Sequence, residues 1–176
     1  MSDYVRDEDF GQIGYLNGEY QVLVQEAHAN VLGIPGLSLP ADYRVEVSAR
    51  QVSSAAGSYV LMFGIGSNDS SYETYQFGVL PGSQEYYLEK RSLSGTWTVL
   101  IGDTYHPAIL PGDTPNRLAV ERVGSTIRLY VNGTQVNSTT DSDFTGAGRD
   151  AGLRAYSYDE APVDMRFDDF AVYRLP

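Results

Sequence analysis

Hydrophobic and polar residues alternate along most of this chain, and the alternation is clearest over residues 116–133. A period of two places alternate side chains on opposite faces of a β-sheet. Between the two alternating stretches stands Gly124-Ser125, and a glycine there can adopt the positive φ that a tight turn needs. This segment predicts a two-stranded hairpin, and Asn132-Gly133 predicts a second turn directly after it.

The same pattern predicts strands through the rest of the chain, at residues 19–27, 43–52, 59–65, 74–79, 85–91, 96–101, 134–140, 152–158 and 163–173. Proline and glycine residues predict a loop at 32–40. Residues 59–65 are apolar on both faces, which is typical of a strand in the middle of a sheet. No stretch has the apolar spacing of an amphipathic helix. We therefore predict an all-β fold, an antiparallel two-sheet β-sandwich of the jelly-roll type.

Length and composition predict a single domain over residues 1–176, in which residues 1–12 form an acidic lead-in along the sandwich edge. The net charge of −11 argues against binding to nucleic acid or to anionic membranes. No apolar run approaches the roughly 18 residues that a membrane-spanning helix requires, so direct membrane insertion is not expected. The chain has no cysteine, so packing rather than disulfide bonds must stabilise it.

Several short motifs occur in a recognisable order: Leu61-Met62-Phe63, Tyr75-Gln76-Phe77, Tyr86-Tyr87-Leu88, Gly95-Thr96-Trp97, Pro115–Leu118, Ile127–Gly133, Gly152-Leu153 and Phe167–Phe170. Together they resemble the concanavalin A-like lectin and glucanase jelly rolls, in the laminin G-like branch that occurs in bacterial exported proteins. They also resemble the domain of the 3-keto-disaccharide hydrolases. The resemblance implies an extracellular or periplasmic location, although the chain itself shows no signal peptide.

A candidate binding face follows from the side chains that oppose the predicted core. The core positions are Val45, Leu61, Phe77, Leu88, Val120, Leu129 and Leu153. Sugars are bound by aromatic faces that cover C–H patches and by polar groups that take the hydroxyls. The residues predicted to bind ligand are Tyr87, Glu89, Arg91, Arg128, Tyr130, Arg154 and Tyr156, beside Arg44 and Glu46. The alternative is a solvated sheet face on which Arg–Glu pairs serve solubility.

Phe167-Asp168-Asp169-Phe170 is the second candidate site. By resemblance to jelly-roll carbohydrate-binding modules, Asp168 or Asp169 would ligate a structural calcium ion. Calcium takes six to eight oxygen ligands, so the further acidic candidates are Asp7, Asp9 and Glu26. The alternative is that one member of the pair caps a turn or pairs with an arginine nearby.

Signals for catalysis are weak, and no catalytic residue is assigned. The Glu-x-Asp-x-x-Glu pattern of retaining glucanases and the Gly-x-Ser-x-Gly elbow are both absent. His28 and His106 are the two histidines, and both are predicted to be structural, as Trp97 is predicted to serve packing. The sequence favours a non-catalytic extracytoplasmic module that binds carbohydrate or another surface polymer. A sugar-processing hydrolase and a structural or protein-interaction sandwich are the alternatives.

Overall fold

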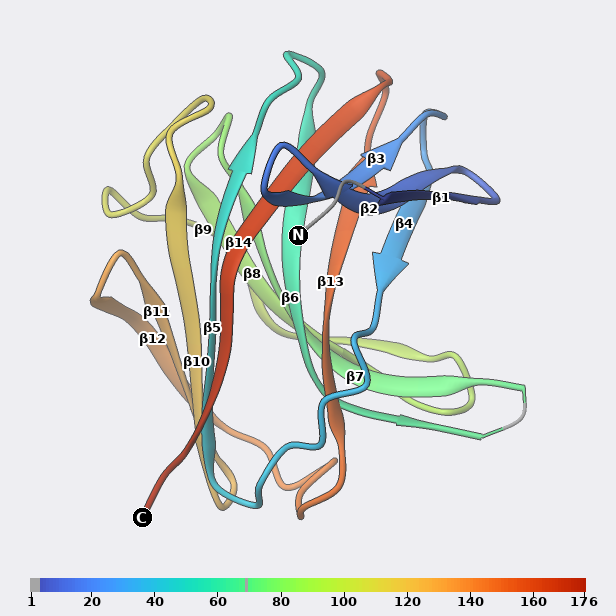
Figure 1. Cartoon of the computed structure of the whole chain (residues 1–176). Coiled ribbons are helices and arrows are strands. Elements are labelled where there is room, and N and C mark those ends of the chain that lie inside the picture. The colour runs from blue at the N-terminus through green and yellow to red at the C-terminus, as the bar shows by residue number, and fades with distance from the viewer. Residues whose placement is uncertain (1–3, 69) are drawn as a thin grey trace.

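The computed structural model describes residues 4–68 and 70–176, and in them two antiparallel sheets face one another (Figure 1). In spatial order, the eight-stranded sheet contains β1 (Tyr4–Glu8), β2 (Gly11–Leu16), β3 (Glu19–Val24), β14 (Val163–Arg174), β5 (Tyr43–Gln51), β10 (Asn116–Val123), β11 (Thr126–Val131) and β12 (Thr134–Thr140). The six-stranded sheet contains β4 (Asn30–Gly33), β13 (Asp150–Ser157), β6 (Gly57–Ser67), β7 (Tyr72–Leu80), β8 (Glu85–Arg91) and β9 (Trp97–Tyr105). The all-β, two-sheet prediction is confirmed.

The hairpin predicted over residues 116–133 is formed by β10 and β11, with Val120 opposite Leu129. Gly124 has a φ of 55° in the turn between them, a conformation that glycine adopts without steric cost. On its other side β10 pairs with β5, where Val120 lies opposite Val45. The hairpin is thus joined to the middle of the eight-stranded sheet.

All seven predicted core residues are buried between the sheets, and Leu153 is the most exposed of them at 5%. A second, smaller apolar cluster covers the outer face of the six-stranded sheet. Its buried members Val60, Met62 and Ile65 lie on β6, with Tyr87 and Tyr156 packed partly over them. Because β6 has apolar residues on both faces, the six-stranded sheet carries a hydrophobic floor on its outside as well as its inside.

One end of the interior is polar. Arg122 is 1% exposed, and its guanidinium lies 4.9 Å from the centre of the Tyr75 ring. It donates hydrogen bonds to the carbonyl oxygens of Asp141 (2.9 Å) and Asp143 (2.7 Å). The Asp141 carboxylate accepts from Tyr75 at 2.5 Å and from Lys90 at 2.5 Å. These contacts fasten the loop after β12 across the end of the sandwich.

Short strands at the start of the chain were not predicted. The acidic lead-in lies at the edge of the large sheet, where β1 pairs with β2 from Asp7↔Gln12 to Tyr4↔Tyr15. Residues 1–3 of the lead-in lie outside the described residues. The loop predicted at 32–40 begins later, because β4 extends to Gly33 and pairs with β13. Both strands are short, and the pairing of their backbones forms them without a clear apolar alternation.

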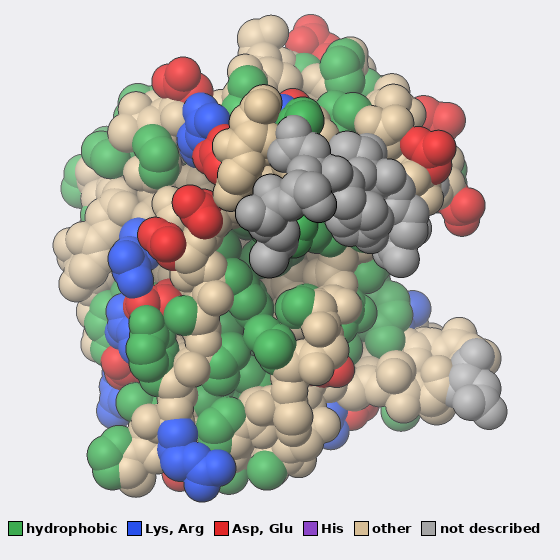
Figure 2. All heavy atoms as spheres, in the orientation of Figure 1, with side chains coloured by type: hydrophobic (Ala, Val, Ile, Leu, Met, Phe, Trp, Pro, Cys, Tyr) green, Lys and Arg blue, Asp and Glu red, His purple; other side chains and the backbone are tan. Residues whose placement is uncertain are grey.

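Hydrophobic side chains are visible in the opening between the two sheets, with acidic and basic side chains scattered around it (Figure 2). The described residues include no helix long and apolar enough to cross a membrane. The two outer faces of the sandwich and the opening between its sheets are the surfaces on which a ligand can bind.

Candidate functional site

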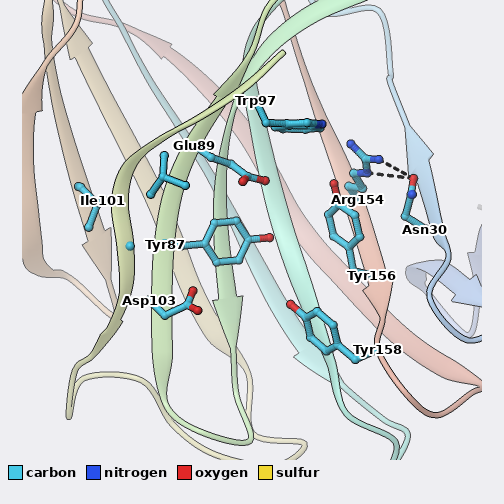
Figure 3. Close-up of a pocket in the computed structure, with 11 residues that line it drawn as sticks. Asn30, Tyr87, Glu89, Trp97, Ile101, Asp103, Arg154, Tyr156 and Tyr158 are labelled. Carbon is cyan, nitrogen blue, oxygen red and sulfur yellow. Dashed lines mark hydrogen bonds between the residues drawn. The ribbon is translucent and has the colours of Figure 1, made fainter. Parts of the chain in front are cut away.

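A groove of about 550 Å³ runs across the outer face of the six-stranded sheet. Its walls come from β4 and β13 on one side and from β8 and β9 on the other (Figure 3). Since β6 and β7 lie between β13 and β8 and neighbouring strands are about 4.8 Å apart, the groove is roughly 19 Å wide from β13 to β9. Its volume is within the range of about 300–1,000 Å³ that small-molecule sites occupy.

A glycine on β7 allows the central ring of the groove to lie across the sheet. Gly78 is paired with Tyr87 on β8, and a Cβ atom at Gly78 would lie 2.1 Å from Cζ of Tyr87. No side chain other than hydrogen fits beneath the ring in this position. On the next strand Val60, fully buried, is paired with Gly78 and belongs to the apolar floor.

Arg154 on β13 is held rigidly in the opposite wall. It is 5% exposed, and it donates two hydrogen bonds to Oδ1 of Asn30, at 3.1 and 2.6 Å, and one to the Tyr72 hydroxyl at 3.0 Å. The guanidinium also lies 4.4 Å from the centre of the Tyr156 ring and 6.0 Å from that of Trp97. All of these hydrogen-bonding and ring partners are neutral, and the charge of Arg154 also acts on the Glu89 carboxyl in the groove.

Trp97 opens β9 and stands above Arg154 and Tyr156 (Figure 3). Its side chain is 40% exposed, and no described residue accepts a hydrogen bond from its indole N–H. Glu89 is its neighbour on the groove side. Burial raises the pKa of the Glu89 carboxyl, and the charge of Arg154 opposes that rise. No described residue donates a hydrogen bond to this carboxylate, which leaves it free to accept one from a ligand.

The other end of the groove is marked by Asp103 on β9 and by Tyr158, which follows β13 (Figure 3). The hydroxyls of Tyr87 and Tyr158 reach toward each other across the floor, and Tyr158 donates to Oγ of Ser58 at 3.2 Å. Burial raises the pKa of Tyr87, Tyr156 and Tyr158. These tyrosines therefore keep their protons and offer neutral hydroxyls beside aromatic faces.

Solved structures with the same architecture have little sequence in common with this chain. No protein-family model matches the sequence, and no curated protein matches it. A Bacillus subtilis protein of unknown function with a galectin-like fold is 16% identical over 93% of this chain and 86% of its own, with a TM-score of 0.71. The carbohydrate-binding module CBM66 from Bacillus subtilis is 17% identical over 97% of this chain and 91% of its own, with a TM-score of 0.61. The catalytic domain of an endo-1,3-β-glucanase from Thermotoga petrophila is 11% identical over 96% and 81%, with a TM-score of 0.66.

The fold is a concanavalin A-like β-sandwich. At these identities the likeness extends to the fold alone, so the chemistry must be argued from the residues. Arg154 and Trp97 meet in the groove although the sequence separates them by more than fifty residues.

The predicted binding face of this concanavalin A-like sandwich is divided between two sheets. Tyr87, Glu89, Arg154 and Tyr156 meet in the groove. Arg91 lies beyond its end, where its guanidinium is 4.4 Å from the centre of the Tyr72 ring and donates to Oγ of Ser71 at 3.2 Å and to the Tyr72 carbonyl oxygen. The prediction of one shared face is wrong because alternation shows which side of its own sheet a residue occupies, but not which sheet.

Arg128 and Tyr130 lie on the outer face of the eight-stranded sheet. There, Arg44 bonds Glu46 and Glu121, each at 3.0 Å, and Tyr130 donates to Glu121 at 2.9 Å. Arg128 is 3.9 Å from Glu121. This face has the self-paired Arg–Glu arrangement that the sequence offered as the alternative to a ligand site.

Asp168 and Asp169 lie in an irregular part of β14, and the pair lines a cavity distinct from the groove. Among residues 4–68 and 70–176, no group of three or more histidine or acidic side chains is arranged to hold a metal ion. Calcium at this pair, with Asp7, Asp9 or Glu26, remains a prediction. Of the histidines, His106 accepts a hydrogen bond from the Ala108 amide at 3.1 Å, and His28 lies 3.7 Å from Asp159.

Seven groove residues were not predicted as binding residues: Asn30, Trp97, Val99, Ile101, Gly102, Asp103 and Tyr158. Trp97, predicted to serve packing in the core or at a hairpin edge, begins the edge strand β9, where it is 40% exposed and lines the groove. The sequence does contain one signal for the position of Trp97. This residue begins β9 just after a glycine turn, and few neighbouring residues can cover a ring at the start of an edge strand. Asn30 and Tyr158 come from segments that alternation does not describe, and only the fold brings them to the groove.

Proposed function

We propose that this chain is a non-catalytic carbohydrate-binding module that holds a glycan in the groove of the six-stranded sheet. The single observation that carries the proposal is the position of one exposed and one half-buried aromatic ring beside hydrogen-bonding groups that have capacity left for a ligand. Trp97 and Tyr156 offer rings, and Arg154 and Glu89 offer a donor and an acceptor beside them. This is the combination by which proteins cover the apolar face of a sugar and bond its hydroxyls.

The structural neighbours support this function without assigning it. One is a carbohydrate-binding module, another has a galectin-like fold and a third is the catalytic domain of an endo-1,3-β-glucanase. An extracytoplasmic location, on a cell surface or in a secreted protein, is part of the proposal, because surface polymers are the glycans that such a module would meet. The net charge of −11 favours neutral glycans over polyanionic ones.

The chain carries its own reporter for the test. Trp97 is the only tryptophan, so a change in tryptophan fluorescence on adding a sugar reports on the groove. We expect a panel of neutral oligosaccharides to contain at least one that changes the emission of Trp97 in a saturable way. If no glycan in the panel alters the emission and none binds by calorimetry, the proposal is wrong.

A matched pair of variants separates groove binding from general effects. Trp97→Ala should weaken binding of the identified glycan about tenfold or more, because it removes a stacking face and its buried area. Tyr130→Ala removes a half-buried aromatic residue from the outer face of the other sheet and should leave affinity unchanged. Equal losses in both variants, measured by calorimetry, would contradict the groove as the binding site.

A hydrolase is the second candidate, and one observation favours it. Glu89, whose pKa is raised mainly by burial, shares the groove with a second carboxylate, Asp103. A protonated acid and an ionised carboxylate are the two groups that glycoside hydrolysis uses. Hydrolysis of a bound glycan, abolished by Glu89→Gln while binding persists, would establish this alternative in place of the non-catalytic function.

A further inference from the structure

The two ends of the groove in the six-stranded sheet differ in the polar groups that they offer to a ligand. Among the described residues that line the groove, Arg154 is the only lysine or arginine, and it stands at the end where Trp97 begins β9. Asp103, Tyr87 and Tyr158 form the other end, which we call the acidic end (Figure 3). The first end supplies hydrogen-bond donors from a guanidinium and an indole, whereas the acidic end supplies oxygen atoms.

The Asp103 carboxylate lacks a partner within the protein. Asp103 is an exposed residue of β9, and its carboxylate points toward Tyr87 and Tyr158 (Figure 3). No described residue donates a hydrogen bond to this carboxylate, and no described lysine, arginine or histidine forms an ion pair with it. The acidic end therefore carries a negative charge that only solvent screens when no ligand is bound.

The environment of Tyr158 reports the same imbalance of charge. Tyr158 donates its hydroxyl proton to Oγ of Ser58 at 3.2 Å, so its oxygen can still accept a hydrogen bond from a ligand. Burial raises the pKa of Tyr158, and the negative charges of Asp103 and Glu89 add to the rise. No positive charge is among the groups that shift it. A potential that retains a proton on a phenol also favours a cation on the ligand.

We propose that the acidic end binds the free amino group of an amino sugar, so that the groove selects glycans that contain one. This inference rests on the glycan-binding function proposed above and names the class of glycan. An ammonium group has three N–H donors, which the carboxylate of Asp103 and the hydroxyl oxygens of Tyr87 and Tyr158 accept. Hydrogen bonds in which a partner is ionised are roughly twice as strong as neutral ones. An ammonium therefore gains more at this end than a hydroxyl in the same place.

The length of the groove requires an oligosaccharide rather than a single amino sugar. Trp97 and Asp103 lie toward opposite ends of β9, a strand of nine residues, so they contact different sugar units. A calcium ion would need six to eight oxygen ligands. Within residues 4–68 and 70–176, no cluster of three or more acidic or histidine side chains is placed to hold a metal ion. An ammonium group needs only the acceptors that the acidic end provides.

Three β-1,4-linked trimers with the same backbone test the role of the amine. The glucosamine trimer has an ammonium group at C2, the N-acetylglucosamine trimer has an acetamide there, and cellotriose has a hydroxyl. Each is titrated into the full chain by calorimetry at a pH where the amine is protonated. We expect the glucosamine trimer to bind at least about fivefold more tightly than either of the others at low salt, with a smaller difference at high salt. If it binds no more tightly than cellotriose, the proposal is overturned.

The remaining outcomes separate this inference from the glycan-binding function. If none of the trimers binds but a glycan of the neutral panel does, the glycan-binding function stands and the amino-sugar inference is wrong. If no glycan of either set binds, both are wrong. Spermidine, a polyamine without sugar rings, measures the attraction of any cation to a chain of net charge −11. Spermidine binding as tight as that of the glucosamine trimer, or displacement of the trimer by calcium chloride at equal concentration, also overturns the proposal.

A matched pair of variants locates the effect at the acidic end. Asp103→Asn keeps the shape of the side chain and removes its charge, so the ratio of the dissociation constants of cellotriose and the glucosamine trimer should fall to about one. Asp159→Asn removes the same charge from an exposed turn directly after Tyr158 and outside the groove lining, and should preserve the ratio. An unchanged ratio in Asp103→Asn, or an equal fall in both variants, refutes the role of Asp103.

Discussion

Replacing Gly78 by alanine tests the geometry of the groove. The structure predicts that this change lowers the free energy of unfolding when Tyr87 is present and raises it when Tyr87 is replaced by alanine. The new Cβ atom would lie 2.1 Å from Cζ and 2.3 Å from Cε1 of the Tyr87 ring. The backbone of Gly78 does not have a positive φ, so alanine itself fits the strand. The whole penalty therefore comes from the overlap with one ring.

The magnitude follows from two opposing effects. Overpacking, or expulsion of the ring from its apolar floor, costs about 1–3 kcal/mol. Replacing glycine by alanine in a compatible conformation stabilises by about 0.4–1 kcal/mol through the unfolded chain. Gly78→Ala should thus be destabilising in the native protein and stabilising in a Tyr87→Ala background. The coupling energy between the two positions should be about 2 kcal/mol, well above the error of such cycles.

The assay is urea-induced unfolding followed by circular dichroism, on the native chain, both single variants and the double variant. Gly102→Ala on β9 serves as the matched control, because no atom lies within 4 Å of its added Cβ. Its effect should remain within about 0.5 kcal/mol and should not depend on Tyr87. If Gly78→Ala has the same sign and size in both backgrounds, Tyr87 does not lie across β7 and the floor of the groove is wrongly described.

Two further outcomes follow from single side chains. Glu89→Gln should raise the free energy of unfolding at neutral pH, because burial raises the Glu89 pKa above its ordinary 4.5 and the ionised form is disfavoured in the fold. That gain should vanish as the pH falls below 4.5, which unfolding measured at several pH values will detect, and a gain independent of pH would contradict it. Asp141→Asn should lower the free energy of unfolding by about 1–3 kcal/mol, because Lys90 and Tyr75 lose a shared carboxylate. Asp113→Asn, at an exposed position, should leave unfolding unchanged under the same denaturant titration, and an equal loss there would rule out a specific role for Asp141.

Alternation of side chains was sufficient to predict most of the strands and the core. Leu61, Phe77 and Leu88 lie on three adjacent strands of one sheet and Val45 and Val120 on two of the other, and each is fully buried. The reason is physical, since a strand with one buried face must repeat apolar residues with a period of two. Short strands such as β1 and β4 escape this rule because backbone pairing alone forms them.

The candidate site was predictable only in part. Tyr87, Glu89, Arg154 and Tyr156 were identified because they oppose core positions on their own strands. Their assignment to one face with Arg128 and Tyr130 failed because sheet membership depends on long-range pairing, such as that of β13 with β6. The bulge at Asp169 was likewise hidden, since an aspartate in a strand gives no sign of a left-handed conformation before the register is known.

The two outer faces contain similar residue types, and their pairing explains why only one is expected to bind a ligand. On the eight-stranded sheet, Arg44 bonds Glu46 and Glu121 at 3.0 Å, so a ligand would have to replace charged partners that are already satisfied. On the six-stranded sheet, Arg154 hydrogen-bonds only neutral groups among the described residues, and the Glu89 carboxylate, on which its charge acts, has no hydrogen-bond donor among them. A ligand gains binding energy when it forms a hydrogen bond to a charged group that still lacks a partner. It gains little when it only replaces a hydrogen bond that the protein already makes. The arginine that binds a glycan is therefore expected to be the one that the sheet has already oriented but has not neutralised.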